Sequence, residues 1–269
     1  MLTPLCFLFV SLVIIVLLVF AFQHHKTKSR LANALKRIET MKLAVSDRDK
    51  LFSIIAHDLR SPMQNLSKFL ELLVQNVLTE DESEKILKEL SLTTRNNYHM
   101  MENLLIWSRN QMEGNNQNPV IFNIGEAARA SERFLALQIN EKEINIENSI
   151  PEELKAYADQ SMVEVVIRNL LSNAIKFTPV KGRVWINAVE EENFVSVTVG
   201  DSGVGISAEE IDKIYALNYT TRGVKNEKGT GIGLHLCKEF VNKSGGNIFV
   251  KSQPGEGSEF TFTLPKNTK

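Results

Sequence analysis

The sequence predicts an α+β multidomain protein, in which an apolar N-terminal helix and a helical hairpin precede a C-terminal α/β sandwich. Three observations carry this prediction. Residues 5–22 are almost entirely apolar. Residues 48–112 repeat apolar side chains at helical spacing, with a turn and an acidic helix start near residues 79–83. After Pro119, short alternating segments typical of strands occur among further helical patterns.

The overall composition excludes several functional classes. The 31 Lys and Arg residues nearly balance the 32 Asp and Glu residues, so no charge bias indicates direct nucleic-acid binding. Cys6 and Cys237 lie far apart in the 269 residues, which argues against a disulfide scaffold or a cysteine zinc cluster and fits a reducing compartment. The function must therefore be sought in local motifs.

The apolar run at residues 5–22 contains Ser11 as its one polar residue and is near the minimum length for a bilayer core of about 30 Å. A buried soluble helix and a cleaved signal peptide are the alternatives. No basic residue precedes the run, and no small-x-small cleavage site follows it. Lys26, Lys28 and Arg30 come after it, which by the positive-inside rule places the following residues in the cytoplasm. We therefore expect a single-pass anchor in the cell membrane, with the domains that follow it in the cytoplasm.

Four regions follow from the distribution of patterns. Residues 5–22 form the transmembrane helix, and residues 23–45 a charged helical linker. Residues 46–113 form two long helices joined by a short loop. A single hairpin cannot bury both of its faces, so we expect a homodimer with a four-helix bundle. A polar stretch rich in turn formers then leads into the last domain, residues 119–266.

The last domain mixes helical and strand patterns. Helices are expected at about 125–139, 160–177 and 231–244, and strands near 144–149, 183–189, 195–199, 247–252 and 260–264. Strands outnumber helices and do not alternate regularly with them. This favours an α/β sandwich over a doubly wound sheet.

His57 is the first candidate for chemistry. On a helical wheel it lies opposite the arc of apolar residues that runs from Leu51 to Val77, so it faces solvent. An ordinary surface histidine is the simpler interpretation. Asp58 follows directly and can orient one imidazole nitrogen, which leaves the other nucleophilic. Pro62 removes a helical hydrogen bond nearby and allows the helix to bend.

Asn169, Asn173 and Lys176 form the second candidate group. The two asparagines are one helical turn apart, and the lysine lies close to the same face. Amide oxygens are hard ligands suited to Mg²⁺, and a lysine ammonium group suits phosphate oxygens. An amphipathic helix with a polar face is the alternative interpretation.

Two glycine clusters complete the set. Asp201, Gly203 and Gly205 follow an expected strand, where a carboxylate can accept a hydrogen bond from an exocyclic amine. The cluster 229–234 opens an expected helix, whose N–H groups suit a phosphate. The intervening residues 207–228 are polar and suit a lid. Candidate phosphate contacts there are Arg222, Lys225 and Lys228.

Taken in order, these segments resemble sensor histidine kinases of two-component signal transduction. FSIIAHDLRSPM is similar to the phosphoacceptor box, NLLSNAIKFT to the asparagine box, and DSGVGI and GTGIGL to the two glycine boxes. IYALNYTTRG stands in place of the phenylalanine box and departs from it, with Tyr215 where phenylalanine is usual. The resemblance covers about 46–265. It implies a dimerisation and histidine-phosphotransfer hairpin followed by an ATP-binding domain of the Bergerat type.

The resemblance also implies the reaction, that of a histidine protein kinase, a phosphotransferase with a nitrogenous acceptor. His57 would accept the γ-phosphoryl group of ATP, and Asp58 would orient or deprotonate it. The group would then pass to an aspartate on the receiver domain of a response regulator. Ser61 occupies the position of a residue that positions water when relatives dephosphorylate the regulator.

The ATP site is likewise implied by the resemblance. Asn173 would coordinate Mg²⁺, with Asn169 and Lys176 beside the phosphates, and Asp201 would contact the adenine amine. The other matched ATP-binding positions are Gly203, Gly205, Arg222, Gly229, Thr230, Gly231, Gly233 and Leu234.

Two rival functions share this fold. The type II topoisomerase and heat-shock chaperone ATPases place a general-base glutamate four residues before the metal-binding asparagine, where this chain has Asn169. A non-catalytic, dimeric ATP-binding scaffold is the other alternative. It would be expected to have lost at least one of His57, Asn173, Asp201 or the glycines, and all are present.

Overall fold

The computed structural model describes only part of the chain. The described residues are 24–26, 28, 31, 60, 63–75, 78–112, 118–217, 219–221, 223–224 and 231–266. The chain divides into two units, Met1–Asp58 and Leu59–Lys269. In the first unit, residues 24–26, 28 and 31 are helical. The expected membrane anchor and most of the linker lie outside the described residues. Within the described residues, no helix combines the length and apolar character needed to cross a membrane.

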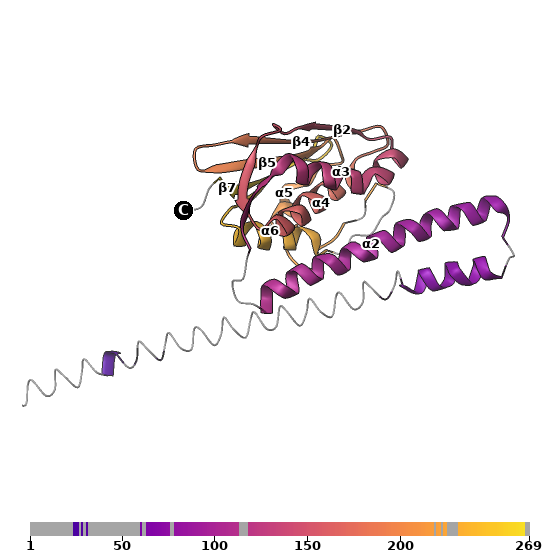
Figure 1. Cartoon of the computed structure of the whole chain (residues 1–269), viewed down its shortest axis with the longest axis horizontal. Coiled ribbons are helices and arrows are strands. Elements are labelled where there is room, and N and C mark those ends of the chain that lie inside the picture. Colours follow the sequence, from indigo (N-terminus) through magenta and orange to yellow (C-terminus); the bar gives the residue numbers. More distant parts are fainter. Residues whose placement is uncertain are drawn as a thin grey trace, which may run out of the picture. The chain divides into compact units, whose positions relative to one another are not determined.

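The hairpin expected from the sequence is present where the structure describes it. Residues 63–74 are helical, and helix α2 spans Glu80–Met112 (Figure 1). The start of α2 is stabilised by Thr79, whose hydroxyl and backbone N–H both donate to the Glu82 carboxylate, at 2.8 Å and 2.9 Å. The Glu82 N–H, which the first helical turn leaves unpaired, donates to the Thr79 hydroxyl at 3.4 Å, so Thr79 and Glu82 together cap the start of α2.

Apolar side chains of the hairpin remain exposed in the single chain. Val74 is 84% exposed. Others on the same two helices are Met63, Leu70, Leu87, Met101 and Leu105. Monomeric proteins seldom leave so many large apolar side chains in water along one element. The four-helix bundle itself stays a prediction, because one chain contains only half of it.

The C-terminal domain is an α/β sandwich, as expected. Its main sheet has the order β2-β4-β5-β7-β6. The strands are β2 Asn145–Ser149, β4 Arg183–Glu190, β5 Phe194–Asp201, β6 Ile248–Gln253 and β7 Gly257–Pro265. Only β2 and β4 pair in parallel, and the other pairs are antiparallel. A second, two-stranded antiparallel sheet joins β1 (Val120–Asn123) to β3 (Lys155–Ala158).

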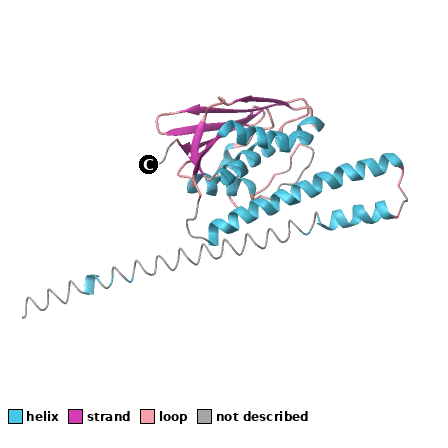
Figure 2. Cartoon of the chain, in the orientation of Figure 1, coloured by secondary structure: helices cyan, strands magenta, loops and turns pink. Residues whose placement is uncertain are grey.

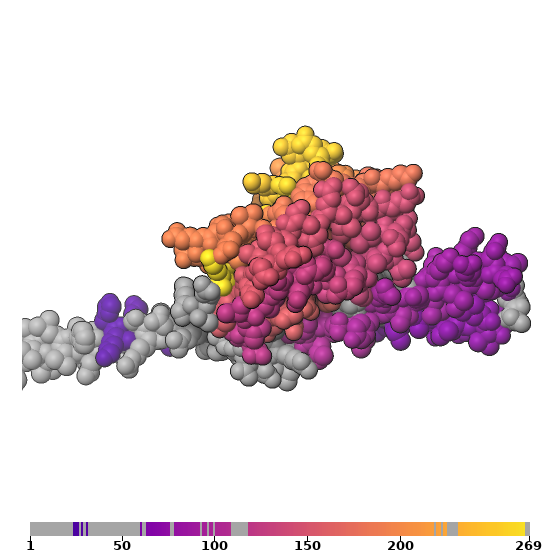
Figure 3. Space-filling model, turned by 45° about the horizontal axis from the view of Figure 1, so that its top comes forward, coloured from indigo at the N-terminus to yellow at the C-terminus, as the bar shows by residue number. Residues whose placement is uncertain are grey.

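Helices cover one face of the main sheet (Figure 2). They are α3 Ile124–Glu141, α4 Gln160–Phe177, the short α5 Ala208–Ile211 and α6 Gly233–Lys243. The core lies between the two layers, where Val195, Val197 and Val199 of β5 are fully buried below α4. Each such side chain contributes roughly 1.5–3 kcal/mol relative to exposure. Figure 3 shows the surface of this domain, coloured from red to yellow, as one continuous body.

Some boundaries differ from those expected. Strands β1 and β3 and helix α5 were not predicted, because each has four residues, too few for a periodic pattern. Strand β5 extends to Asp201, so this residue ends the strand instead of following it. Helix α6 begins at Gly233, two residues later than expected. The segment 207–228, interpreted as a lid, begins with α5, which is capped by Ser207 and Glu210.

Candidate nucleotide-binding site

One cavity collects the residues that the sequence singled out. Its volume is about 620 Å³, within the range of small-molecule sites. It is walled by α4, by parts of α2 and of the C-terminal half of α3, by the end of β5 with the following turn, by residues 219–221 and by the start of α6. The predicted residues that line it are Asn169, Asn173, Lys176, Asp201, Gly205, Gly231, Gly233 and Leu234. The tertiary structure therefore brings segments from distant parts of the sequence to one place.

Helix α4 presents the polar wall. Its N-cap Asp159 accepts a hydrogen bond from the Met162 N–H, and its apolar face is buried, including Ile167 and Leu171. Asn169 and Asn173 emerge on the cavity side, as the helical spacing predicted.

Asn169 is held in place by its own helix and by the approach of α6. Its amide nitrogen donates to the Val165 carbonyl at 3.0 Å. A Cβ atom added to Gly233 would lie only 2.9 Å from the Asn169 amide oxygen. Glycine at this position therefore allows the start of α6 to approach α4 closely.

Asp201 is a buried acceptor in the opposite wall. Its side chain accepts a hydrogen bond from the Gly203 N–H at 2.8 Å, and the residue is 5% exposed. Burial raises the pKa of this carboxyl from 3.8 to about 6, although hydrogen bonds from the Gly203 and Ser258 N–H groups act in the opposite direction. Among the described residues no cation pairs with this carboxylate, and a buried acceptor of this kind suits a ligand with a hydrogen-bond donor.

The turn after Asp201 requires glycine for steric reasons. A Cβ on Gly203, which itself does not line the cavity, would lie 2.5 Å from the Phe177 carbonyl oxygen. Gly205 has a φ of +72°, and a Cβ there would lie 1.9 Å from the Gln253 carbonyl oxygen. The turn after Asp201 therefore packs closely against the end of α4 on one side and against the β6–β7 turn on the other, and only glycine leaves enough room.

Lys176 lies at the rim of the cavity. Its ammonium group donates to the Thr221 carbonyl at 3.3 Å and lies 4.8 Å from the centre of the Phe177 ring. A mobile, compact cation at this edge can contact phosphate oxygens.

The sequence analysis missed two supporting interactions. The Lys142 ammonium group is buried and donates to the carbonyls of Ile175 and Lys176, at 3.0 Å and 2.9 Å. The Tyr219 hydroxyl donates to Glu210 at 2.8 Å and so holds one edge of the cavity to α5. No local signal marks either pair, because the partners are separated along the chain.

Tyr215, the departure from the phenylalanine box, does not line this cavity. Its backbone carbonyl lies 3.1 Å from the His235 ring. Within the described residues its buried hydroxyl has no hydrogen-bond partner, and burial raises the pKa of that phenol.

Several predicted site residues lie outside the described residues. They are His57, Asp58, Ser61, Arg222, Lys225, Lys228, Gly229 and Thr230. Their roles stay predictions.

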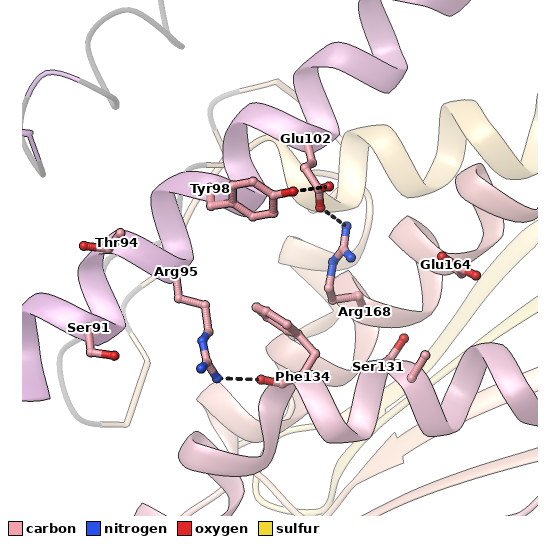
Figure 4. Close-up of a pocket in the computed structure, with 10 residues that line it drawn as sticks. Ser91, Thr94, Arg95, Tyr98, Glu102, Ser131, Phe134, Glu164 and Arg168 are labelled. Carbon is pink, nitrogen blue, oxygen red and sulfur yellow. Dashed lines mark hydrogen bonds and ion pairs between the residues drawn. The ribbon is translucent and has the colours of Figure 1, made fainter.

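A second pocket of about 700 Å³ lies where α2 meets α3 and α4 (Figure 4). The guanidinium groups of Arg95 and Arg168 lie 5.5 Å and 5.8 Å from the centre of the Phe134 ring. Arg168 also donates to Asn103 at 3.2 Å, and Glu102 lies 4.0 Å away. Burial lowers the pKa of the Arg168 guanidinium. The surface of α2 that faces α3 and α4 is therefore polar and cationic, whereas other side chains of α2 are apolar and exposed.

Comparison with known proteins identifies the class of the C-terminal domain and several relatives of the longer chain. Residues 158–268 match the family described as "Histidine kinase-, DNA gyrase B-, and HSP90-like ATPase". The C-terminal domain is thus an ATP-binding domain of the Bergerat type, as its sheet and cavity indicate. Among curated proteins, the chain is 32% identical over 235 residues to the aerobic respiration control sensor protein ArcB of Escherichia coli, covering 84% of this chain and 30% of ArcB. It is 30% identical to the adaptive-response sensory kinase SasA of Gloeothece citriformis, covering 88% of this chain and 63% of SasA. Over most of its length the chain is therefore similar to sensor histidine kinases, and it spans less than two thirds of these relatives.

Solved structures agree with this assignment. The catalytic domain of histidine kinase ThkA aligns with a TM-score of 0.51 at 29% identity, covering 56% of this chain and 99% of that domain. The Acinetobacter baumannii histidine kinase AdeS aligns over 79% of this chain and 98% of its own, with a TM-score of 0.59 at 21% identity, which shows likeness of fold alone.

Proposed function

We propose that this chain is a membrane-anchored histidine kinase that uses Mg-ATP to phosphorylate His57 and then phosphorylates an aspartate of a response regulator. One observation carries the proposal. Asn169, Asn173 and Lys176 project from one face of α4 into the same cavity as buried Asp201. Amide oxygens suited to a hard cation and an ammonium group thus lie along one wall, and a carboxylate suited to a purine amine lies in another.

The residues of the cavity fit the parts of ATP. Asp201 accepts a hydrogen bond from the adenine amine, and the glycine turn lets the base approach the backbone. The Asn173 amide oxygen holds Mg²⁺, while Asn169 and Lys176 contact the phosphates. When bound there, Mg²⁺ would neutralise the negative charge that develops on the transferred phosphoryl group.

The transfer needs one nitrogen nucleophile. An unprotonated imidazole nitrogen of His57 attacks the γ-phosphorus, the bond to the β-phosphate oxygen breaks and ADP leaves. Asp58 holds the proton on the other ring nitrogen. In the second step an aspartate oxygen of the regulator attacks the same phosphorus and the N–P bond breaks. The complex of ThkA with the response regulator protein TrrA supports a regulator as the partner.

Two features support a homodimer at a membrane. The exposed apolar side chains of the hairpin, such as Leu70 and Leu105, suit a second copy packed into a four-helix bundle. The apolar run 5–22 and the basic residues after it suit a single span with the kinase on the cytoplasmic side.

Autophosphorylation of the full chain in detergent tests the proposal. Incubation with γ-labelled Mg-ATP is expected to give an adduct that is labile in acid and stable in base. His57→Gln should abolish labelling and leave ATP affinity unchanged. Residual labelling of His57→Gln would place the acceptor elsewhere. A parent protein that binds ATP without any labelling would favour the non-catalytic scaffold.

A further inference from the structure

We propose that Lys142 is a positioning residue for the phosphate side of the nucleotide site, an inference that rests on the proposed function. Its ammonium group reaches from the end of α3 to the end of α4 and holds the helical turn that carries Asn173 and Lys176. Lys142 itself lines the cavity, but its ammonium group donates to this turn, so it acts by fixing the backbone from which both side chains project.

The end of α4 has carbonyl groups that need a donor. In a helix the last four carbonyls lack an intrahelical partner. Thr178 donates to the Ala174 carbonyl through both its N–H and its hydroxyl, at 3.1 Å and 2.6 Å. The Ile175 carbonyl cannot receive the next helical bond, because the residue four positions later is Pro179, which has no N–H. Lys142 supplies the donor instead.

A buried cation suits this position for a second reason. The carbonyls at a helix C-terminus carry partial negative charge, which a cation stabilises. Lys142 is 5% exposed, and its ammonium group lies 3.0 Å and 2.9 Å from the last-turn carbonyl oxygens of Ile175 and Lys176. Its backbone is fixed as well, since its N–H donates to Gln138 and its carbonyl accepts from the Lys181 N–H.

The turn held by Lys142 is the junction of three cavity walls. The Lys176 carbonyl also accepts from the Val224 N–H at 3.3 Å, in the segment after the first lid residues. The Phe177 carbonyl accepts from the Val204 N–H at 3.3 Å, in the turn after Asp201. Loss of the ammonium group would remove the donor from the buried Ile175 carbonyl and leave the part-buried Lys176 carbonyl with the Val224 N–H, and the turn would shift to recover the lost bond.

The expected consequence is a loss of affinity that depends on phosphate. Lys142→Met keeps most of the apolar stem and removes the donor and the charge. We expect its Kd for Mg-ATP to rise roughly tenfold, about what one lost charged hydrogen bond is worth. Adenosine has no phosphate, so its Kd should change less than about twofold, which lies within the scatter expected for a neutral contact. The readout is the ratio of the two dissociation constants, measured on the full chain by calorimetry.

Thr178→Val is the matched control. It removes a buried side-chain hydrogen bond at the same helix end, to the Ala174 carbonyl, and leaves the Ile175 and Lys176 carbonyls untouched. It should lower the melting temperature, as Lys142→Met does, but leave the ATP-to-adenosine ratio unchanged. If Lys142→Met fails to fold, Lys142→Gln, which keeps an uncharged donor, should show a smaller shift of the ratio in the same direction.

The outcomes separate this inference from the proposed function. A parent protein that binds neither ATP nor adenosine refutes the nucleotide site itself. A parent that binds both, with Lys142 variants whose ratio equals that of the parent, overturns the positioning role even if their melting temperatures fall. A ratio that shifts equally in Thr178→Val overturns it too, because any damage to the helix end would then suffice.

Discussion

Asp201 gives ATP binding a specific dependence on pH. Its carboxyl has a pKa of about 6 because it is buried at the cavity wall. From this value about 3% of the protein is protonated at pH 7.5 and about 90% at pH 5.0. A protonated carboxyl is a poorer acceptor for the adenine amine. If only the ionised form binds well, the Kd for ATP should rise about tenfold between these two pH values.

The triphosphate titrates in the same range, so the assay compares two nucleotides. Inosine triphosphate carries the same phosphates but has a carbonyl in place of the adenine amine. Protonated Asp201 can donate to that carbonyl, whereas ionised Asp201 cannot. The ratio of the Kd for inosine triphosphate to the Kd for ATP should therefore fall as the pH falls through about 6. Calorimetry on the full chain measures both constants.

Two results would refute this reasoning. A ratio that stays flat between pH 7.5 and pH 5.0 would show that Asp201 does not contact the base or does not titrate there. An Asp201→Asn variant with the same pH dependence as the parent would assign the titration to another group. The variant itself should show a flat ratio, since its amide does not titrate.

Three further predictions concern Asp201, the transfer to His57 and Ser61. Without nucleotide, the folded state binds a proton at Asp201 more tightly than the unfolded state does. The contribution of this group to the free energy of unfolding should therefore be greatest below pH 3.8 and decrease by about 3 kcal/mol as the pH rises through about 6. Urea unfolding of Asp201→Asn should lack this pH dependence. A mixed dimer of His57→Gln and Asn173→Asp subunits should be labelled by γ-labelled ATP if transfer occurs between subunits, and should stay unlabelled if transfer occurs within one subunit. A protein that sediments as a monomer at micromolar concentration would contradict the four-helix bundle. Ser61→Ala should slow ADP-dependent dephosphorylation of a phosphorylated regulator, and Ser61→Thr should preserve it. The reason is that a hydroxyl one helical turn from His57 can position water. Equal rates for the parent and Ser61→Ala would leave the serine with a purely structural role.

Much of the fold was determined by local pattern. Helix α4 begins and ends at the residues expected, Gln160 and Phe177. Its apolar positions recur at helical spacing, Asp159 caps its start and Pro179 prevents its continuation. The five strands of the main sheet were likewise expected, two of them, at 195–199 and 260–264, from alternating side chains. The short β1 and β3 were missed, because pairing with each other stabilises them and their own sequences do not.

The candidate site divides in the same way. The sequence by itself determined the residue types and their spacing, so Asn169, Asn173 and Lys176 were known to share a helical face. Only the tertiary structure decided that Asp201 is buried enough for its pKa to rise to about 6. Only packing placed Lys142 against the end of α4, since in the sequence it is one lysine among charged neighbours. Periodicity within an element is encoded over a few residues, whereas burial and long-range contacts depend on how distant elements pack.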